Sequence, residues 1–435
     1  MNNNAITSER KRPGAAKRHC MIVHAYYPLG ETRVQRQAEA LLKRGYQVDV
    51  ISLRKEGEAA RETFKGTRIY RLPVRRYRRG GLAAQFLEYV AFLFMAMVTV
   101  SWRHLITPYA TVQLHSPPDF LVFAGWLPRL LGARLILDLH DLMPEFYMGR
   151  FGRGAGSLPV RLVRLQERLS TRFADHVITV SHHWRQNLIE RGVPGEKVSV
   201  VMNVADDAIF VRPDGEGPAL NGAGSTNGSG QRSGLRLIYH GAVVERYGLD
   251  LALHAMACLE DQAPDIHLTI LGRGDYMESL RNLARELKVD GRVAFYYELR
   301  PAEELPAIIL QADAGIVPYR DDPFTDGLLP TKLMEYAALG LPSIAARTTA
   351  IERYFEGTMA ELFTPNSVED LASVLKALYA DRGRLAALAR RADAFNRTYN
   401  WTKIGAEYVD LVERLGTGAA ASRLPAPVDA EERSA

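Results

Sequence analysis

The chain has 435 residues, 47% of them apolar, which is more than one hydrophobic core usually organises and enough to fill two. Its formal net charge is only +5, from 55 basic and 50 acidic residues, and its only cysteines are Cys20 and Cys258. Because these two lie far apart in the sequence, they form no disulfide framework and no metal-ligand spacing, which indicates a reducing compartment.

The first 18 residues are predicted to form a disordered basic tail, in which Glu9 is outnumbered by Arg10, Lys11, Arg12, Lys17 and Arg18. This segment is polar and lacks the apolar region of a secretory signal peptide. We therefore expect a cytoplasmic protein.

Residues 19–211 alternate short β-rich segments with helical ones. The expected strands are 20–26, 46–53, 67–74, 111–115, 134–141, 176–181 and 197–204, and the expected helices include 32–44, one near 120–131 and one near 159–172. Alternation of this kind is typical of parallel strands joined by crossover helices. The segment is therefore predicted to be a doubly wound α/β domain.

A second basic cluster precedes an apolar run in this domain. Arg75, Arg76, Arg78 and Arg79 are interrupted only by Tyr77, and the run from Tyr89 to Trp102 carries no charge. At 14 residues it is shorter than the roughly 20 needed to cross a bilayer. Two interpretations stay open: a buried core helix, or a helix resting on the cytoplasmic leaflet with the arginines on lipid headgroups.

Residues 212–234 are rich in Gly, Ser, Asn and Pro and are predicted to be a flexible linker. The alternation then resumes, so residues 235–395 are predicted to form a second doubly wound domain. We expect a terminal helix over 396–415 and a disordered tail over 416–435. Two α/β domains that face each other with their strand ends would form a cleft between them.

The segment DGLLPTKLMEYAALGLP, from Asp326 to Pro342, predicts a helix that starts at Pro330 and Thr331, with the Thr331 side chain as its cap. Lys332 then lies in the first turn, where the helix dipole disfavours a cation unless an anion is near. A phosphate group would supply that anion. Glu335, one turn later, could accept hydrogen bonds from ribose hydroxyls. The alternative is an ordinary amphipathic helix with a solvated lysine and glutamate.

Other candidate residues follow predicted strands, because ligands of parallel sheets lie beyond the carboxyl ends of the strands. They are Gly30 and Arg33 after the first strand, His140 after the strand LILDL, Gly241 and Arg246 in the second domain, and then Gly272 and Gly274. A histidine between acidic neighbours can donate a hydrogen bond or accept a proton near neutral pH, although a purely structural role stays open. No Asp-x-Asp pair is present for a metal-bound diphosphate. We therefore expect no metal and no cofactor.

Taken together, these segments resemble family 4 of the retaining glycosyltransferases, which have the GT-B fold of two facing Rossmann-like domains. The resemblance spans Cys20 to Leu415 and rests on the glycine turn with Arg33 and on these segments: DLHDLMPE (138–145), ITVS (178–181), VVMNVAD (200–206), YHGAVVERYGLDLAL (239–253), LTILGRGD (268–275), RVAFYYELRP (292–301) and PTKLMEYAALGLPSIAA (330–346). It implies that the second domain binds a nucleotide sugar, that the first binds the acceptor, and that the terminal helix crosses back onto the first domain.

The resemblance also assigns roles. Glu335 matches the second glutamate of the family's Glu-x7-Glu motif, whereas the first would fall at Gly327, beside Asp326. A subgroup with a Pro-Ser/Thr-Lys-x-x-Glu-Tyr signature also lacks that first glutamate and uses a lysine, here Lys332. The candidate catalytic residues are thus His140, Arg246 and Lys332, and the candidate nucleotide-sugar-binding residues are Gly30, Arg33, Gly241, Gly272, Gly274, Asp326, Gly327, Thr331 and Glu335.

The resemblance implies transfer of a sugar from a nucleoside diphosphate to an acceptor hydroxyl, with retention at the anomeric carbon and without a metal. The expected partners are a nucleoside diphosphate sugar, a saccharide or lipid-linked acceptor and an anionic membrane surface, with the protein peripheral on the inner face of the plasma membrane. Nucleic acid is not expected, because Tyr77 is the only aromatic residue in either basic cluster. A nucleotide-sugar epimerase of the same fold and a non-catalytic basic membrane-binding module remain alternatives.

Overall fold

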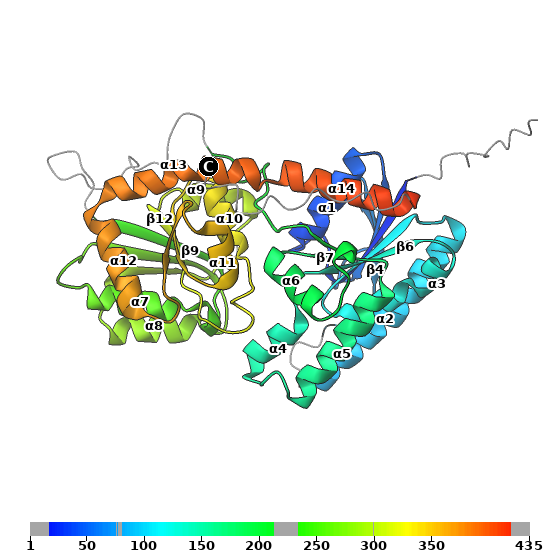
Figure 1. Ribbon diagram of the computed structural model, residues 1–435, viewed down its shortest axis with the longest axis horizontal. Helices are drawn as coiled ribbons and strands as arrows, with labels where there is room; N and C mark the ends of the chain where they lie inside the picture. Colours follow the sequence, from blue (N-terminus) through cyan, green and yellow to red (C-terminus); the bar gives the residue numbers. More distant parts are fainter. Residues whose placement is uncertain (1–16, 75, 77–80, 213–233, 299, 419–435) are drawn as a thin grey trace, which may run out of the picture.

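The computed structural model describes residues 17–74, 76, 81–212, 234–298 and 300–418. Figure 1 shows two α/β units, each with its own sheet, and a helix that passes from the second unit over to the first. Most of the predicted linker and of both predicted tails lies outside the described residues. Three residues given to the tails belong to regular elements instead, since Arg18 opens the first strand and Gly416 and Thr417 end the last helix.

The first sheet has eight strands in the order β3-β4-β2-β1-β5-β6-β7-β8, all parallel except the β3–β4 pair. They are β1 (Arg18–Tyr26), β2 (Gln47–Leu53), β3 (Arg61–Phe64), β4 (Thr67–Leu72), β5 (Thr111–His115), β6 (Arg134–Leu139), β7 (His176–Thr179) and β8 (Val198–Val200). The helical segments are α1 (Thr32–Lys43), α2 (Gly81–Ile106), η1 (Asp119–Gly125), α3 (Trp126–Leu130), α4 (Met143–Phe151), α5 (Leu158–Phe173), α6 (His182–Glu190) and η2 (Gly195–Lys197).

The structure differs from the expected elements at one helix of this domain. The helix expected near 120–131 is a 3-10 segment, η1, followed by the short α3. The two meet at Gly125, where a Cβ atom would come within 2.5 Å of the Leu135 side chain on β6. Pro128 has no N–H for the helical hydrogen bonds and clashes with the turn before it, which explains why one regular helix does not run through this segment.

Helix α2 is longer than the uncharged run and is not a buried core helix. It spans 26 residues and includes Glu88 and Arg103, because their neighbours on both sides are also good helix formers. By length and composition, residues 83–106 would suffice to cross a membrane, and only 22% of the most apolar part is buried. One stripe, with Phe92, Ala96 and Val100, packs into the domain core. The opposite side is open.

The second sheet has six parallel strands in the order β11-β10-β9-β12-β13-β14. They are β9 (Leu235–Ala242), β10 (Ile266–Arg273), β11 (Val293–Tyr296), β12 (Ala314–Val317), β13 (Ser343–Ala346) and β14 (Ala360–Phe363). The helical segments are η3 (Glu245–Tyr247), α7 (Leu249–Cys258), α8 (Met277–Glu286), η4 (Asp290–Arg292), η5 (Ala302–Glu304), α9 (Leu305–Ile309), α10 (Thr331–Ala338), α11 (Thr349–Phe355), α12 (Val368–Ala380) and α13 (Arg382–Thr398).

The last helix, α14 (Trp401–Thr417), crosses back to the first domain, as the family resemblance implies (Figure 1). The Asn400 side chain caps its first turn by accepting from the Lys403 N–H. Tyr408, fully buried, donates a hydrogen bond of 2.7 Å to Gln113 on β5. Apolar residues of α14 pack into a buried cluster that includes residues of both sheets, so this helix belongs physically to both domains.

Candidate functional site

The carboxyl ends of β9 and β10 approach so closely that side chains are excluded there. Gly241 and Gly272 face each other in register, and a Cβ atom on Gly272 would lie 1.8 Å from the Gly241 carbonyl oxygen. A Cβ atom on Gly274 would meet the carbonyl oxygen of Val243 at 1.7 Å. Packing alone thus requires two of these three glycines. Their contact with a ligand stays a prediction.

Helix α10 begins at Thr331, as expected, and the chain turns out of it at Gly340 with φ +70°. The expected cap by the Thr331 side chain is wrong. Pro330 holds the N-cap position and no side chain accepts from the first turn, because a proline that restricts the entry leaves no polar cap in place. Within the described residues, the N–H groups of Thr331 and Lys332 have no hydrogen-bond acceptor, so they can bind an anion.

Lys332 lies in this first turn with its ammonium group in a cage of tyrosines. Its Nζ donates a 2.8 Å hydrogen bond to the Tyr319 hydroxyl and lies 4.8 to 5.1 Å from the ring centres of Tyr239, Tyr247 and Tyr319. Burial lowers the pKa of Lys332 to about 8, although Glu335 works in the opposite direction. A lysine so poorly hydrated gains more than usual from a nearby anion.

Glu335 is one turn further along α10, beside Lys332. Its Oε2 lies 2.5 Å from Nε2 of His240, and the other ring nitrogen of His240 lies 3.0 Å from the Tyr336 hydroxyl. Tyr336 in turn donates to the Ile238 carbonyl. The histidine thus fixes the orientation of the Glu335 carboxylate. His240 sits directly before Gly241 at the end of β9, so its place in the sequence was the signal that should have marked it as a site residue.

Arg246 reaches from the second domain to the first. Its guanidinium lies 5.5 Å from the ring of Phe146 on α4 and 5.4 Å from Phe324. Burial raises the pKa of Asp141, next to His140, to about 6, and the charge of Arg246 opposes this rise. The Nη1 atom of Arg246 is buried and has no hydrogen-bond partner. A buried donor without an acceptor favours an anionic ligand at this point.

Gly327 lies at the contact between the domains, whereas Asp326 bonds to α11 of its own domain. The Asp326 carboxylate accepts a 2.7 Å hydrogen bond from the Thr349 N–H and so caps α11. Gly327 packs against Trp184 on α6 of the first domain. A side chain at position 327 would collide with that indole, which gives a physical reason for the missing first glutamate.

His140 ends a buried polar chain in the first domain. His115 Nδ1 lies 3.0 Å from Nε2 of His140 and 3.3 Å from Oδ2 of Asp138. Burial lowers the pKa of His140 to about 3 even though Asp138 opposes the change. The imidazole is therefore neutral near neutral pH. It can still donate a hydrogen bond, as expected, but it does not take up a proton there.

Arg33 is inside this chain. Its guanidinium donates two hydrogen bonds to Asp138 and others to the Val201 carbonyl and the Asn203 side chain. Burial alone would raise the pKa of Asp138, but Arg33 and the two histidines hold it well below its usual range. Gly30, in the loop before α1, has φ +80° and open space around it. Ligand binding by either residue stays a prediction.

Within the described residues, one group of three side chains has metal-ligand geometry: His115, Asp138 and His140, whose ligating atoms lie within 4.8 Å of one another. The Asp138 carboxylate already accepts from Arg33, Gln37 and Gln113. Its lone pairs are therefore taken by protein donors, so the donor set suits a hydrogen-bonded chain better than a cation.

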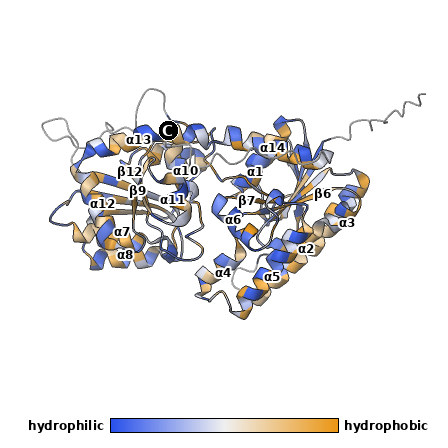
Figure 2. Ribbon diagram, in the orientation of Figure 1, coloured by the Kyte–Doolittle hydropathy of each residue, from blue (hydrophilic) through white to orange (hydrophobic). Residues whose placement is uncertain are grey.

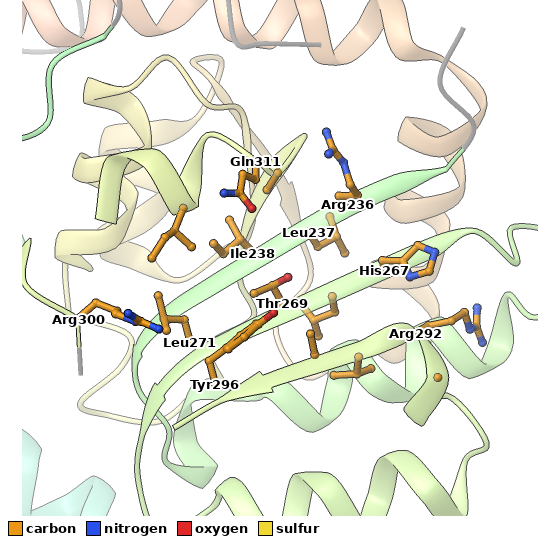
Figure 3. A pocket seen from close by; sticks show the side chains of 16 residues that line it. Arg236, Leu237, Ile238, His267, Thr269, Leu271, Arg292, Tyr296, Arg300 and Gln311 are labelled. Carbon is orange, nitrogen blue, oxygen red and sulfur yellow. The ribbon is translucent and has the colours of Figure 1, made fainter. Parts of the chain in front are cut away.

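A cavity of about 540 Å³ lies over β9, β10 and β11, and Figure 3 shows the side chains that line it. None of the predicted site residues is among them. Two of its arginines already have acid partners, since Arg236 pairs with Asp313 and Arg300 with Glu298. The cavity is therefore separate from the group formed by Lys332 and Glu335.

The two facing doubly wound units define the GT-B class of fold. Solved structures agree: sucrose-phosphate synthase from Thermosynechococcus elongatus superimposes with a TM-score of 0.71 at 18% identity, over 93% of this chain and 100% of that one. At this identity the likeness shows the fold alone.

Family models identify the chain more closely. A glycosyl transferase 4-like domain matches residues 30–203 and a glycosyl transferases group 1 domain matches residues 232–395. Together they include every strand of the two sheets except β1, and the chain belongs to this family of glycosyltransferases.

Sequence relatives carry related names. A GDP-mannose-dependent alpha-(1-6)-phosphatidylinositol monomannoside mannosyltransferase of Mycolicibacterium smegmatis is 32% identical over 39% of this chain and 45% of its own length. The amylovoran biosynthesis glycosyltransferase AmsK of Erwinia amylovora is 24% identical over 55% and 56%, respectively. The chain thus spans about half the length of these relatives, so what they act on is carried over only as a proposal.

Proposed function

We propose that this protein transfers a sugar from a nucleoside diphosphate to an acceptor hydroxyl with retention of configuration. One observation carries the proposal: a buried lysine at the open N-terminus of α10, with Glu335 one turn further along. The first turn of α10 and the Lys332 ammonium would hold the diphosphate, and Glu335 the ribose hydroxyls. Arg246, whose buried Nη1 has no partner, would approach the diphosphate from the other side.

The slow step is departure of the diphosphate, on which negative charge develops. Two cations and helix N–H groups placed in advance would stabilise that charge by several kcal/mol, in the range of about 2.7–4 kcal/mol for each well-placed donor. A leaving phosphate oxygen can take the proton of the acceptor hydroxyl on the same face of the sugar. The new bond then forms where the old one broke, which gives retention. Neutral His140 would donate a hydrogen bond to the sugar.

No metal is required in this mechanism, because protein cations neutralise the diphosphate. The second domain would bind the donor and the first the acceptor. The names of the relatives point to polysaccharide or glycolipid assembly. We also propose that the Lys332 segment places the chain in the Pro-Ser/Thr-Lys-x-x-Glu-Tyr subgroup and that the protein works in the cytoplasm.

The first test measures thermal unfolding with a panel of nucleoside diphosphate sugars. A ligand that binds only the native state stabilises it by about 2.7 kcal/mol at 100 times its Kd, and the midpoint should rise with concentration. Lys332→Ala and Arg246→Ala should fold normally, lose this protection and lose most turnover. Protection that is unchanged in both variants would contradict the diphosphate assignment.

The second test separates transfer from isomerisation. Each stabilising donor is incubated with EDTA and without acceptor, and the products are separated by chromatography. A transferase returns the donor or slowly hydrolyses it, whereas an epimerase makes a new sugar nucleotide. Sugar transfer that EDTA abolishes and Mg²⁺ or Mn²⁺ restores would contradict the metal-free mechanism.

A further inference from the structure

The first domain turns two apolar helix faces outward. On α2, Leu87, Phe94, Val98, Trp102 and Leu105 are each 56% to 68% exposed. On α5, the corresponding fraction is 50% to 67% for Leu158, Leu162, Leu165 and Leu169. Both helices contact η1, and Figure 2 shows apolar segments along both on the same edge of the domain. We call these nine residues the apolar face.

Helix α5 is amphipathic in the reverse of the usual sense. A surface helix normally buries its apolar stripe and exposes its polar side. Here α5 buries Glu167, Ser170 and Thr171 and exposes the leucines. Exposed apolar area costs about 25 cal/mol per Å², and contiguous patches of this kind mark interaction sites.

The charges around the apolar face indicate what covers it. All charged side chains exposed on α5 are arginines: Arg161, Arg164, Arg168 and Arg172. The single acid of this helix, Glu167, points inward and pairs with Arg191. A second copy of the chain would bring the same arginines together and would be repelled.

We propose that the apolar face docks on the surface of an anionic lipid bilayer, with α2 and α5 lying in the plane of the headgroups. Leucines and aromatic residues would enter the acyl boundary while the arginines contact lipid phosphates. Aromatic Trp102 fits the interfacial region, where an apolar ring and a polar N–H are both accommodated.

The same structure excludes a crossing helix in this folded state. The inner stripe of α2 is built into the domain, with Phe92, Ala96 and Val100 fully buried. Glu88 on this stripe lies 3.0 Å from His24 of β1. A helix that is fixed to a sheet along one side cannot be surrounded by lipid, so it rests on the bilayer.

The orientation brings the candidate site close to the membrane. Helix α4 packs beside α5, and its Phe146 meets Phe324 of the second domain at 5.4 Å between ring centres. A lipid-linked acceptor in the same bilayer would therefore reach the contact between the domains without leaving the membrane. This consequence rests on the proposed function, whereas membrane docking itself does not.

The test is flotation of the purified full chain with two kinds of vesicle. One kind is pure phosphatidylcholine, and the other contains about 30% phosphatidylglycerol as the anionic lipid. We expect strong binding only to the anionic vesicles, weakened by salt. Arg161→Gln with Arg168→Gln should lower partitioning about thirtyfold. Leu162→Gln with Leu165→Gln should lower it by more than about tenfold. Phe94→Gln with Val98→Gln provides a second apolar pair on α2.

Matched controls are Arg390→Gln with Arg391→Gln on α13, which removes the same charge from the other domain, and Val211→Gln, an exposed apolar residue elsewhere. All should bind as the unaltered protein does, and circular dichroism should confirm folding. Equal binding by the face variants and the controls would overturn the proposal, as would failure of the unaltered protein to bind. A dimer in ultracentrifugation that Leu162→Gln and Leu165→Gln dissolve would assign the apolar face to a second copy instead.

Discussion

A Cβ atom placed on Gly327 lies 2.0 Å from Nε1 of Trp184, so the second domain touches the first through a residue without a side chain. The indole Nε1 is buried and has no hydrogen-bond partner. Nearby, the Tyr354 hydroxyl of α11 accepts a 2.8 Å hydrogen bond from the His182 N–H of α6. Position 327 therefore limits how closely the two domains approach.

Gly327→Glu, which restores the missing glutamate of the family motif, should lower kcat/KM by more than about a hundredfold. The new side chain would hold the domains apart, and a displacement of about 1 Å at a reacting centre can cost that much. Steady-state kinetics and the radius of gyration in solution measure the two effects. Gly291→Ala is the control, because Gly291 has open space around it. A fully active Gly327→Glu variant would refute the importance of this contact.

Donor binding should weaken as pH rises above about 8. Burial lowers the pKa of Lys332 to about 8, so its charge is lost there, and a bound diphosphate would raise this pKa again. Affinity should then fall by up to about tenfold per pH unit, with proton uptake on binding. The facing tyrosines do not interfere, because burial raises the pKa of Tyr247 to about 12 and raises those of Tyr239 and Tyr319 well above their ordinary value.

Calorimetry of UDP, GDP and ADP binding between pH 7 and 10, in buffers of different ionisation enthalpy, measures this directly. Lys332→Gln should bind weakly throughout and show no break near pH 8. The same residue affects stability with the opposite trend. Because the folded pKa lies below the ordinary value of 10.5, the unfolded chain holds more protons between these pH values, and this contribution to stability rises with pH there.

His240→Ala should raise the donor KM about tenfold while kcat changes little. His240 does not need to touch the reacting atoms, since it holds the Glu335 carboxylate at 2.5 Å. Without it the carboxylate turns freely and ribose binding loses part of its preorganisation. His267→Ala, an exposed histidine on β10, is the control. A drop confined to kcat would place His240 in the chemical step instead.

Asp138→Asn should lower the free energy of unfolding by about 3–5 kcal/mol, because it leaves the buried Arg33 without its charge partner. Asp410→Asn, which breaks an exposed pair with Arg44, should cost less than about 1 kcal/mol. Denaturant unfolding of both variants gives the comparison. Similar losses in the two would mean that the buried chain does not hold the first domain together.

The Asp138 effect should also depend on pH. The folded pKa lies well below the unfolded value of about 3.9, so the stabilisation is fully present above the unfolded value and is lost progressively as pH falls from there towards the folded pKa. Unfolding curves from pH 7 down to pH 3 should show a steeper loss for the unaltered protein than for Asp138→Asn. Parallel curves would contradict the ion-pair explanation.

Sequence patterns predicted the two α/β domains well, because parallel strands buried on both faces appear as continuous apolar runs such as LRLIYH. They also predicted where α10 begins and ends, since Pro330 and Gly340 restrict the backbone locally. The orientation of α2 could not be predicted. Its residues are apolar on all sides, so only the sheet decides which stripe, here that of Phe92, is covered.

The site was predictable in part, for a similar reason. The charge of Lys332 at a helix start is a local property and was found in the sequence. The tyrosine cage and the His240–Glu335 pair join residues that are 13 to 95 positions apart, and only the fold brings them together. The roles expected for Asp326 and Arg33 overlooked competing partners, the Thr349 N–H and Asp138 respectively, which lie far away in the chain.

The passage of α14 back to the first domain has a consequence for synthesis on the ribosome. Gln113 of β5 emerges early, but the Tyr408 hydroxyl that it accepts from is translated almost 300 residues later, since the two are separated by 295 positions. Part of the core of the first domain therefore stays exposed until the final helix leaves the exit tunnel. A nascent chain arrested before Trp401 should be bound by chaperones, and its release should coincide with completion of the last helix.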